Sequence, residues 1–161
     1  MWSYTAGGRI DTPPTVHGGC ALFGAADGWV YCVRATDGQL VWRRRAAPED
    51  LRITDDDQLE SPWPVHGSVL LFHDVAYFTA GRSSFLDGGM VLCGLDPRTG
   101  EKRYETRLEG PHPDAATLDE AAYAMEGAKS DLLVQGEQRE ATRSATFLRA
   151  RDPTTGRETC C

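Results

Sequence analysis

The chain has 161 residues, 40% of them hydrophobic, which is enough for one ordinary domain with a core. Its formal net charge of −7 argues against a nucleic-acid surface, and its 17 Gly and 9 Pro favour short strands joined by turns over long helices. The longest mostly apolar run, 69–80, is interrupted by His73 and Asp74 and is too short to span a bilayer. The first residues lack the basic and apolar regions of a secretory signal peptide. An all-β protein with no transmembrane segment is therefore expected.

The first unit, 1–45, shows the pattern of four short antiparallel strands. Aligning W-S-Y-T-A with W-R-R-R-A places Trp2 where Trp42 stands, so residues 1–6 are expected to be the last strand of a preceding unit. The Asp37-Gly38 pair supplies a hairpin turn. Alternating aromatic and β-branched residues predict strands at 15–16, 20–24, 29–34 and 39–44. Four strands within about 40 residues are typical of a propeller blade.

An acidic linker, 46–62, follows, with Asp55-Asp56-Asp57 in its middle. Such a charge run predicts a solvated loop, because a calcium site needs more oxygen ligands at set spacing. Val-His-Gly then precedes an apolar run at His66, as it does at His17. We interpret the two histidines as repeat equivalents with a structural role in turns, rather than as two catalytic bases.

The second unit, 63–108, repeats the hairpin over 89–104. An aromatic residue follows the turn glycine by four positions in both units, Gly38 to Trp42 and Gly100 to Tyr104. A longer connection, 79–89, is inserted between two strands, and its apolar residues Phe85 and Leu86 are expected to be buried. Insertions in repeat units map to one face, often the binding face, although such a loop can also pack on itself or on a neighbouring blade. The ligand-binding candidates are Arg82, Ser83, Ser84, Asp87 and His66.

The remaining sequence repeats less clearly. Residues 109–130 predict a loop with a short helix, capped at Asp114 and ended at Gly127. Residues 131–161 predict a degenerate partial blade, with Cys160 where the aromatic residue should be. The five cysteines show no metal-ligand spacing, so no metal site is expected. Cys32 and Cys93 occupy matching places in the two units and are expected to be small core residues.

The two hairpins resemble the pyrroloquinoline-quinone (PQQ)-like repeat of quinoprotein-type β-propellers. The family's blade motif is roughly Ala-x-Asp-x-x-Thr-Gly-x-x-x-Trp. L-D-P-R-T-G-E-K-R-Y matches it with Tyr104 for the Trp, and A-T-D-G-Q-L-V-W matches it in shortened form. The resemblance, which covers about 2–108 well, implies that Trp42, Tyr104 and Trp2 dock on the glycine turn of an adjacent blade. A large ring can cover backbone that only glycine leaves bare, which gives Gly38 and Gly100 their role.

The resemblance implies two functions. Quinoprotein dehydrogenases bind PQQ with calcium over the axis of a closed ring, and a ring takes about 4–8 blades; other members use the repeat for protein contacts. Since this chain has two clear blades and no internal Cys-Cys pair, we expect an incomplete ring without a cofactor. It would be a non-enzymatic scaffold or a protein-interaction or ligand-binding module, with other blades, subunits or a protein as partners. The alternative is a fragment of a PQQ-dependent oxidoreductase, with PQQ, calcium and the 81–89 loop near the ligand.

A third hypothesis, a metal or serine hydrolase, would require His17, His66 or Ser83 to converge with acidic residues. Relatives are commonly periplasmic, although this chain shows no signal peptide.

Overall fold

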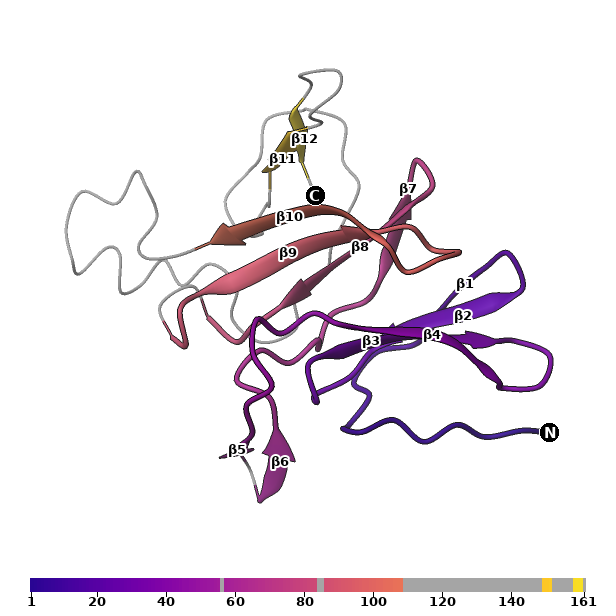
Figure 1. The fold of residues 1–161 in the computed structure, drawn as a ribbon, viewed down its shortest axis with the longest axis horizontal. Helices are drawn as coiled ribbons and strands as arrows, with labels where there is room; N and C mark the ends of the chain where they lie inside the picture. The colour runs from indigo at the N-terminus through magenta and orange to yellow at the C-terminus, as the bar shows by residue number, and fades with distance from the viewer. Residues whose placement is uncertain (56, 84–85, 109–148, 152–157, 161) are drawn as a thin grey trace.

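The computed structural model describes residues 1–55, 57–83, 86–108, 149–151 and 158–160 (Figure 1). These residues form strands and turns, and this part of the chain contains no helix that could cross a membrane. The strands in chain order are β1 Thr15–His17, β2 Cys20–Gly24, β3 Trp29–Arg34, β4 Leu40–Arg45, β5 Ile53–Asp55, β6 Gln58–Glu60, β7 Leu70–Phe72, β8 Val75–Ala80, β9 Met90–Leu95, β10 Lys102–Leu108, β11 Arg149–Arg151 and β12 Glu158–Cys160.

Two sheets of four antiparallel strands dominate the structure. The first has the order β1-β2-β3-β4 and the second the order β10-β9-β8-β7, so each is a meander of sequential strands. The strands of the first sheet lie within one residue of the predicted ranges. The chain is therefore an all-β protein built from propeller blades, as its repeats predicted.

Three hairpins in the chain share one turn length. In each hairpin the two paired residues nearest the turn are seven positions apart in the chain: Val33↔Leu40, Leu95↔Lys102 and Arg151↔Glu158. In the first two, the turn glycine donates its N–H to the carbonyl four residues earlier at 2.8 Å. The motif comparison suggested that the first turn is shortened, but both turns have the same length. The first turn has Arg34 where the second has Asp96.

A β-bulge precedes the aromatic residue of both outer strands. Pairing shifts between Cys32↔Trp42 and Val33↔Leu40, which leaves Val41 as the extra residue, and the matching shift in the second sheet leaves Arg103. A bulge changes the direction of the side chain that follows it. The shared bulge therefore orients Trp42 and Tyr104 in the same way within their sheets.

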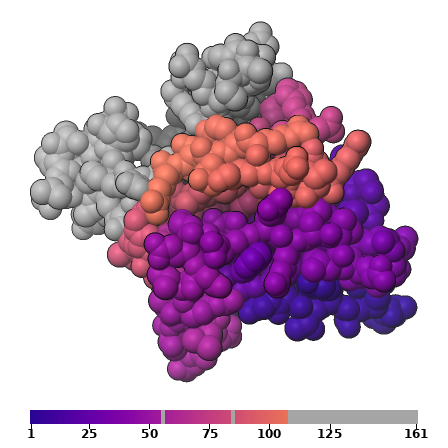
Figure 2. All heavy atoms as spheres, viewed as in Figure 1, coloured from indigo at the N-terminus to yellow at the C-terminus, as the bar shows by residue number. Residues whose placement is uncertain are grey.

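The two sheets pack face to face, and Figure 2 shows the orange surface of β10 against the purple surface of the segment that holds β4. Phe78 and Leu22 are almost fully buried in this core, and Trp63 and Val65 of the connecting segment complete it. Gly24 is required here because a Cβ would approach Val65 Cγ1 to 2.2 Å. Cys32 and Cys93 are both buried in this core, but the prediction that they occupy matching places is wrong, because Cys32 pairs with Trp42 whereas Gly94, not Cys93, pairs with Tyr104.

The N-terminal segment covers the other face of the first sheet. Its Tyr4 ring lies edge-on to Phe23 and Tyr31, at centroid distances of 6.1 and 5.8 Å. No strand forms over 1–6, so that expectation is wrong. The described residues offer this segment no neighbouring strand to pair with, and side-chain packing holds it instead.

The acidic linker differs from the expected solvated loop. It contains the β5–β6 hairpin, with Asp57 at its turn in a left-handed conformation (φ 61°). Glu60 and Ser61, at the end of the linker, are buried. The helix expected within 109–130 lies outside the described residues, as does most of the partial blade at 131–161, where β11 and β12 pair with each other.

Candidate functional site

The loop 81–89 joins β8 to β9, where the first sheet has only the short turn 25–28. Arg82 and Asp87 form an ion pair across it, with 2.7 Å between Nη2 and Oδ2. Asp87 is left-handed (φ 54°), and the Gly89 N–H donates to Leu86 O at 2.9 Å. These contacts close the loop on itself.

Burial within the loop only partly follows the sequence prediction. Ser83 is 5% exposed, whereas Leu86 is 56% exposed, so the prediction that Leu86 is buried is wrong. Ser84 and Phe85 lie outside the described residues. Of the four loop candidates, the structure brings Arg82 and Asp87 together.

Two backbone hydrogen bonds fix this loop beside the connection between the sheets. The Gly81 N–H donates to Pro64 O at 3.0 Å, and the Val65 N–H donates to Ala25 O at 3.1 Å. Consequently the turn 25–28, the segment 61–66 and the start of the inserted loop meet at one end of the two sheets. Polar side chains gather at this end.

A chain of four charged or titratable side chains links the N-terminal segment to the linker. Arg9 pairs with Glu60 at 3.0 Å and with Asp11 at 2.6 Å, and Asp11 Oδ2 lies 2.5 Å from His66 Nδ1. The Glu60 side chain is only 3% exposed. Since a buried carboxylate is costly without a partner, Arg9 compensates Glu60.

The pKa of Asp11 reports on this network. Burial raises the pKa of the carboxyl group, but the hydrogen bonds from Arg9 and His66 outweigh it, so the pKa lies below its ordinary value. Asp11 is thus stabilised as a carboxylate between two donors. The network joins residues about 50 positions apart, beyond the reach of any local sequence pattern.

The predicted equivalence of His17 and His66 is wrong. His17 ends β1 and precedes the turn into β2, a position that Phe72 occupies in the second sheet. His66 lies four residues before β7 begins. The Val-His-Gly similarity therefore joins non-equivalent positions, because the longer linker shifts the register of the second unit. His17 also lies at the opposite end of β2 from the turn 25–28, away from the inserted loop.

A second buried polar cluster surrounds Asp27. Tyr31 donates its hydroxyl hydrogen to Asp27 Oδ2 and accepts the Gly7 N–H at 3.2 Å, and the Trp29 N–H donates to Asp27 Oδ1 at 3.2 Å. Burial, and then the bond to Asp27, raises the pKa of Tyr31 to about 12. A Cβ at Gly7 would lie 2.4 Å from Asp27 Oδ2. Asp27 was not among the site residues expected from the sequence, where the Gly7-Gly8 pair was the available signal.

Two tryptophans make the same contact with two turn glycines. The Trp2 ring lies over Gly38, where a Cβ would come within 2.4 Å of Cε3, and its Nε1–H donates to Ala35 O at 3.0 Å. The Trp42 ring lies over Gly100, where a Cβ would come within 2.7 Å of Cδ2.

The hydrogen bond repeats as well, since Trp42 Nε1–H donates to Pro97 O at 3.2 Å. Each indole thus covers a glycine and bonds the carbonyl three residues before it. Trp42 reaches from the first sheet to the second. Tyr104 is half-buried, and the matching turn glycine for it, Gly156, lies outside the described residues.

The turn 25–28, the segment 61–66 and the start of the 81–89 loop meet at one end of the two sheets, called the loop end from here on. The polar side chains at the loop end are paired with one another. Among the described residues, no group of three or more His, Cys, Asp and Glu could hold a metal ion. The Arg9–Glu60 and Asp11–His66 pairs and the hydrogen bond from Gly7 to Tyr31 join separate segments of the chain.

Blades of four antiparallel strands, joined by ring-on-glycine contacts, define a PQQ-like repeat propeller protein. Residues 1–116 match the family model described as "Outer membrane protein assembly factor BamB". The chain belongs to this family. No curated protein matches it.

Several solved structures are similar to this chain. Quinohemoprotein alcohol dehydrogenase ADHIIG of Pseudomonas putida HK5 shares 16% identity over 74% of this chain and 16% of its own, with a TM-score of 0.49. Quinohemoprotein alcohol dehydrogenase from Comamonas testosteroni is 18% identical to this chain; the match covers 70% of this chain and 15% of the enzyme, with a TM-score of 0.49. BamB of Moraxella catarrhalis is 19% identical to this chain; the match covers 65% of this chain and 28% of BamB, with a TM-score of 0.41. The chain thus spans less than a third of each of these proteins.

Proposed function

We propose that this chain is a non-enzymatic scaffold, a segment of PQQ-like blades that serves as a protein-interaction module. The observation that carries the proposal is how the polar side chains at the loop end are used. Arg9 pairs with Glu60 and Asp11 with His66 across separate chain segments, and Arg82 pairs with Asp87 within the 81–89 loop. Side chains committed in this way position backbone rather than a substrate.

The ring-on-glycine contacts support the same proposal. In this role, Trp42 joins the first blade to the second and Trp2 joins the N-terminal segment to the first blade. Family membership is compatible with protein partners, since the matching model describes an assembly factor. Fold alone does not assign an activity, and the same repeats also build quinoprotein dehydrogenases.

The competing function, a fragment of a PQQ-dependent oxidoreductase, is tested by adding PQQ with Ca²⁺ to the full chain. A ligand at about one hundred times its dissociation constant stabilises the folded state by about 2.7 kcal/mol, which a thermal melt detects. We expect no change in melting temperature or in the visible spectrum of PQQ. A saturable rise in melting temperature with both PQQ and Ca²⁺, absent with either alone, would contradict the scaffold function.

Light scattering on the same sample gives the mass of the particle in solution. A cooperative melt from a defined monomer or oligomer, without a response to PQQ, supports a scaffold that folds by itself. In an oligomer that responds to PQQ, several chains would complete one ring around the ligand.

A further inference from the structure

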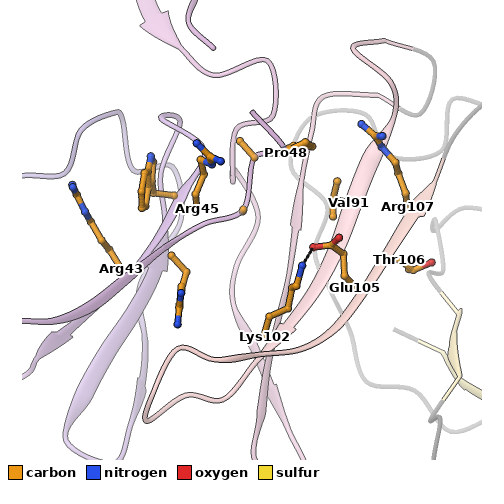
Figure 3. Close-up of a pocket in the computed structure, with 12 residues that line it drawn as sticks. Arg43, Arg45, Pro48, Val91, Lys102, Glu105, Thr106 and Arg107 are labelled. Atoms are coloured by element: carbon orange, nitrogen blue, oxygen red, sulfur yellow. Dashed lines mark hydrogen bonds and ion pairs between the residues drawn. The ribbon is translucent and has the colours of Figure 1, made fainter. Parts of the chain in front are cut away.

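A groove runs between the edge strands β4 and β10 of the two sheets (Figure 3). It consists of two hollows, of about 680 and 450 Å³, which share Arg44, Arg45, Lys102 and Glu105 in their walls. Figure 3 shows Arg43 and Arg45 on one side and Lys102, Glu105 and Arg107 on the other. The groove thus lies at the junction of the two blades.

The groove is basic although the chain is acidic. Five of the chain's 17 basic residues line it, with only two of its 24 acidic ones. This concentration runs against the net charge of −7, so the groove carries an excess of basic groups on an acidic chain. Basic side chains gathered in a cleft attract a negatively charged partner.

The basic groups on the β4 side remain accessible. Arg43 lies over the Trp29 ring, 4.8 Å from its centroid, and Arg45 is exposed. Neither forms an ion pair with a described carboxylate. Arg44 donates Nε–H to Gly100 O at 2.7 Å, which holds the two walls together. On the opposite side, Lys102 pairs with Glu105 at 2.8 Å.

The floor of the groove is apolar. Ala46, Ala47 and Val91 line it and are buried, and the half-buried Trp29 stands beside them. A simple inorganic anion would make no use of this floor. The groove therefore suits a ligand that carries separated negative charges with an apolar side chain between them.

We infer that this groove binds an extended acidic segment of a partner protein. Its carboxylates pair with Arg43 and Arg45, where arginine can form two parallel hydrogen bonds to each, and an apolar side chain between them packs on Ala46, Ala47 and Val91. This inference rests on the proposed scaffold function, for which it names the surface and the chemistry of the partner.

The test uses a fluorescein-labelled peptide rich in glutamate with two central leucines, titrated with the full chain and followed by fluorescence anisotropy. The variant R43E/R45E reverses two charges in the groove. The matched control R52E/R98E makes the same change in net charge at exposed arginines outside it. Since Arg43 contacts Trp29, the single variant R45E is measured as well, and circular dichroism confirms that each variant is folded.

We expect the peptide to bind wild type and R52E/R98E alike, and R43E/R45E about tenfold more weakly, because each exposed ion pair contributes a few-fold in affinity. Binding should weaken as salt rises. A glutamine version of the peptide should not bind.

Three results would overturn the inference: no binding up to about 1 mM peptide, equal loss in both double variants, or tighter binding of inorganic polyphosphate or DNA than of the peptide. None of these three results would contradict the proposed scaffold function. The PQQ and Ca²⁺ titration, run in parallel, tests that function separately.

Discussion

Replacing Trp42 by alanine tests the contact between the two sheets. The mutation removes a ring that covers Gly100 and an Nε1–H bond of 3.2 Å to Pro97 O. Burying an aromatic ring of this kind is worth about 1.5–3 kcal/mol, and the hydrogen bond about 1 kcal/mol. Because Trp42 is half-buried, we expect W42A to lower the free energy of unfolding by about 2–4 kcal/mol.

The assay is urea unfolding followed by far-ultraviolet circular dichroism, since the mutation itself alters tryptophan fluorescence. W2A is the matched control: Trp2 makes the same contact with Gly38, but it is 41% exposed and holds only the N-terminal segment. W2A should lower the free energy of unfolding by less than W42A does, about 1 kcal/mol. A loss below about 1 kcal/mol for W42A, or one no larger than that for W2A, would refute a docked Trp42.

A double-mutant cycle with Gly100 separates ring contact from general destabilisation. G100A places a Cβ 2.7 Å from the Trp42 ring at a φ of 70°. In the W42A background only the backbone strain remains, about 1–2 kcal/mol, so the two losses should not add. Simple additivity would show that the ring does not rest on the glycine.

Three further predictions follow from the same structure. G38A should destabilise more than G18A, because a Cβ at Gly38 meets the Trp2 ring whereas at Gly18 it meets nothing within 4 Å, and both glycines have positive φ; equal losses in urea unfolding would contradict the contact. R82A and D87A should lower stability by at most about 1 kcal/mol each, since the pair is partly exposed; loss of partner binding at unchanged stability would instead make the 81–89 loop a site. Burial raises the pKa of the Cys32 and Cys93 thiols to about 12 from 9.0, with smaller contributions from Cys20 and Glu105 respectively. The folded state therefore holds these protons more tightly, and their contribution to stability is complete below pH 9 and lost as the pH rises toward 12. C93A should flatten this alkaline decline, and an unchanged slope between pH 9 and 12 would exclude the thiol as its cause.

Local patterns in the sequence determined the strands and their order. Alternating side chains and a turn glycine place each hairpin of the first unit, and the spacing from Gly38 to Trp42 and from Gly100 to Tyr104 reveals the repeat. Such signals need only neighbouring residues, so they survive without any knowledge of the fold. The same spacing led to the family resemblance over about 2–108, and the family model matches residues 1–116.

Local similarity also misled where the unit length changed. Val-His-Gly occurs before both apolar runs, yet the longer linker gives His17 and His66 different places in their sheets. Two triplets of identical sequence carry no information about which strand follows them. The β5–β6 hairpin within the linker was missed for a related reason, because a run of charge is as compatible with a hairpin turn as with a loop.

The sequence by itself thus determined an all-β chain of repeated four-stranded units and identified the aromatic residues that follow their turns. Tertiary structure alone decided that Arg9, Glu60, Asp11 and His66 form one network and that Arg43 and Arg45 line the groove to which Lys102 contributes from β10. The physical reason is distance along the chain. Hydrogen bonds and ion pairs between residues about 50 positions apart depend on how the two sheets pack, and neither periodicity nor turn chemistry encodes that packing.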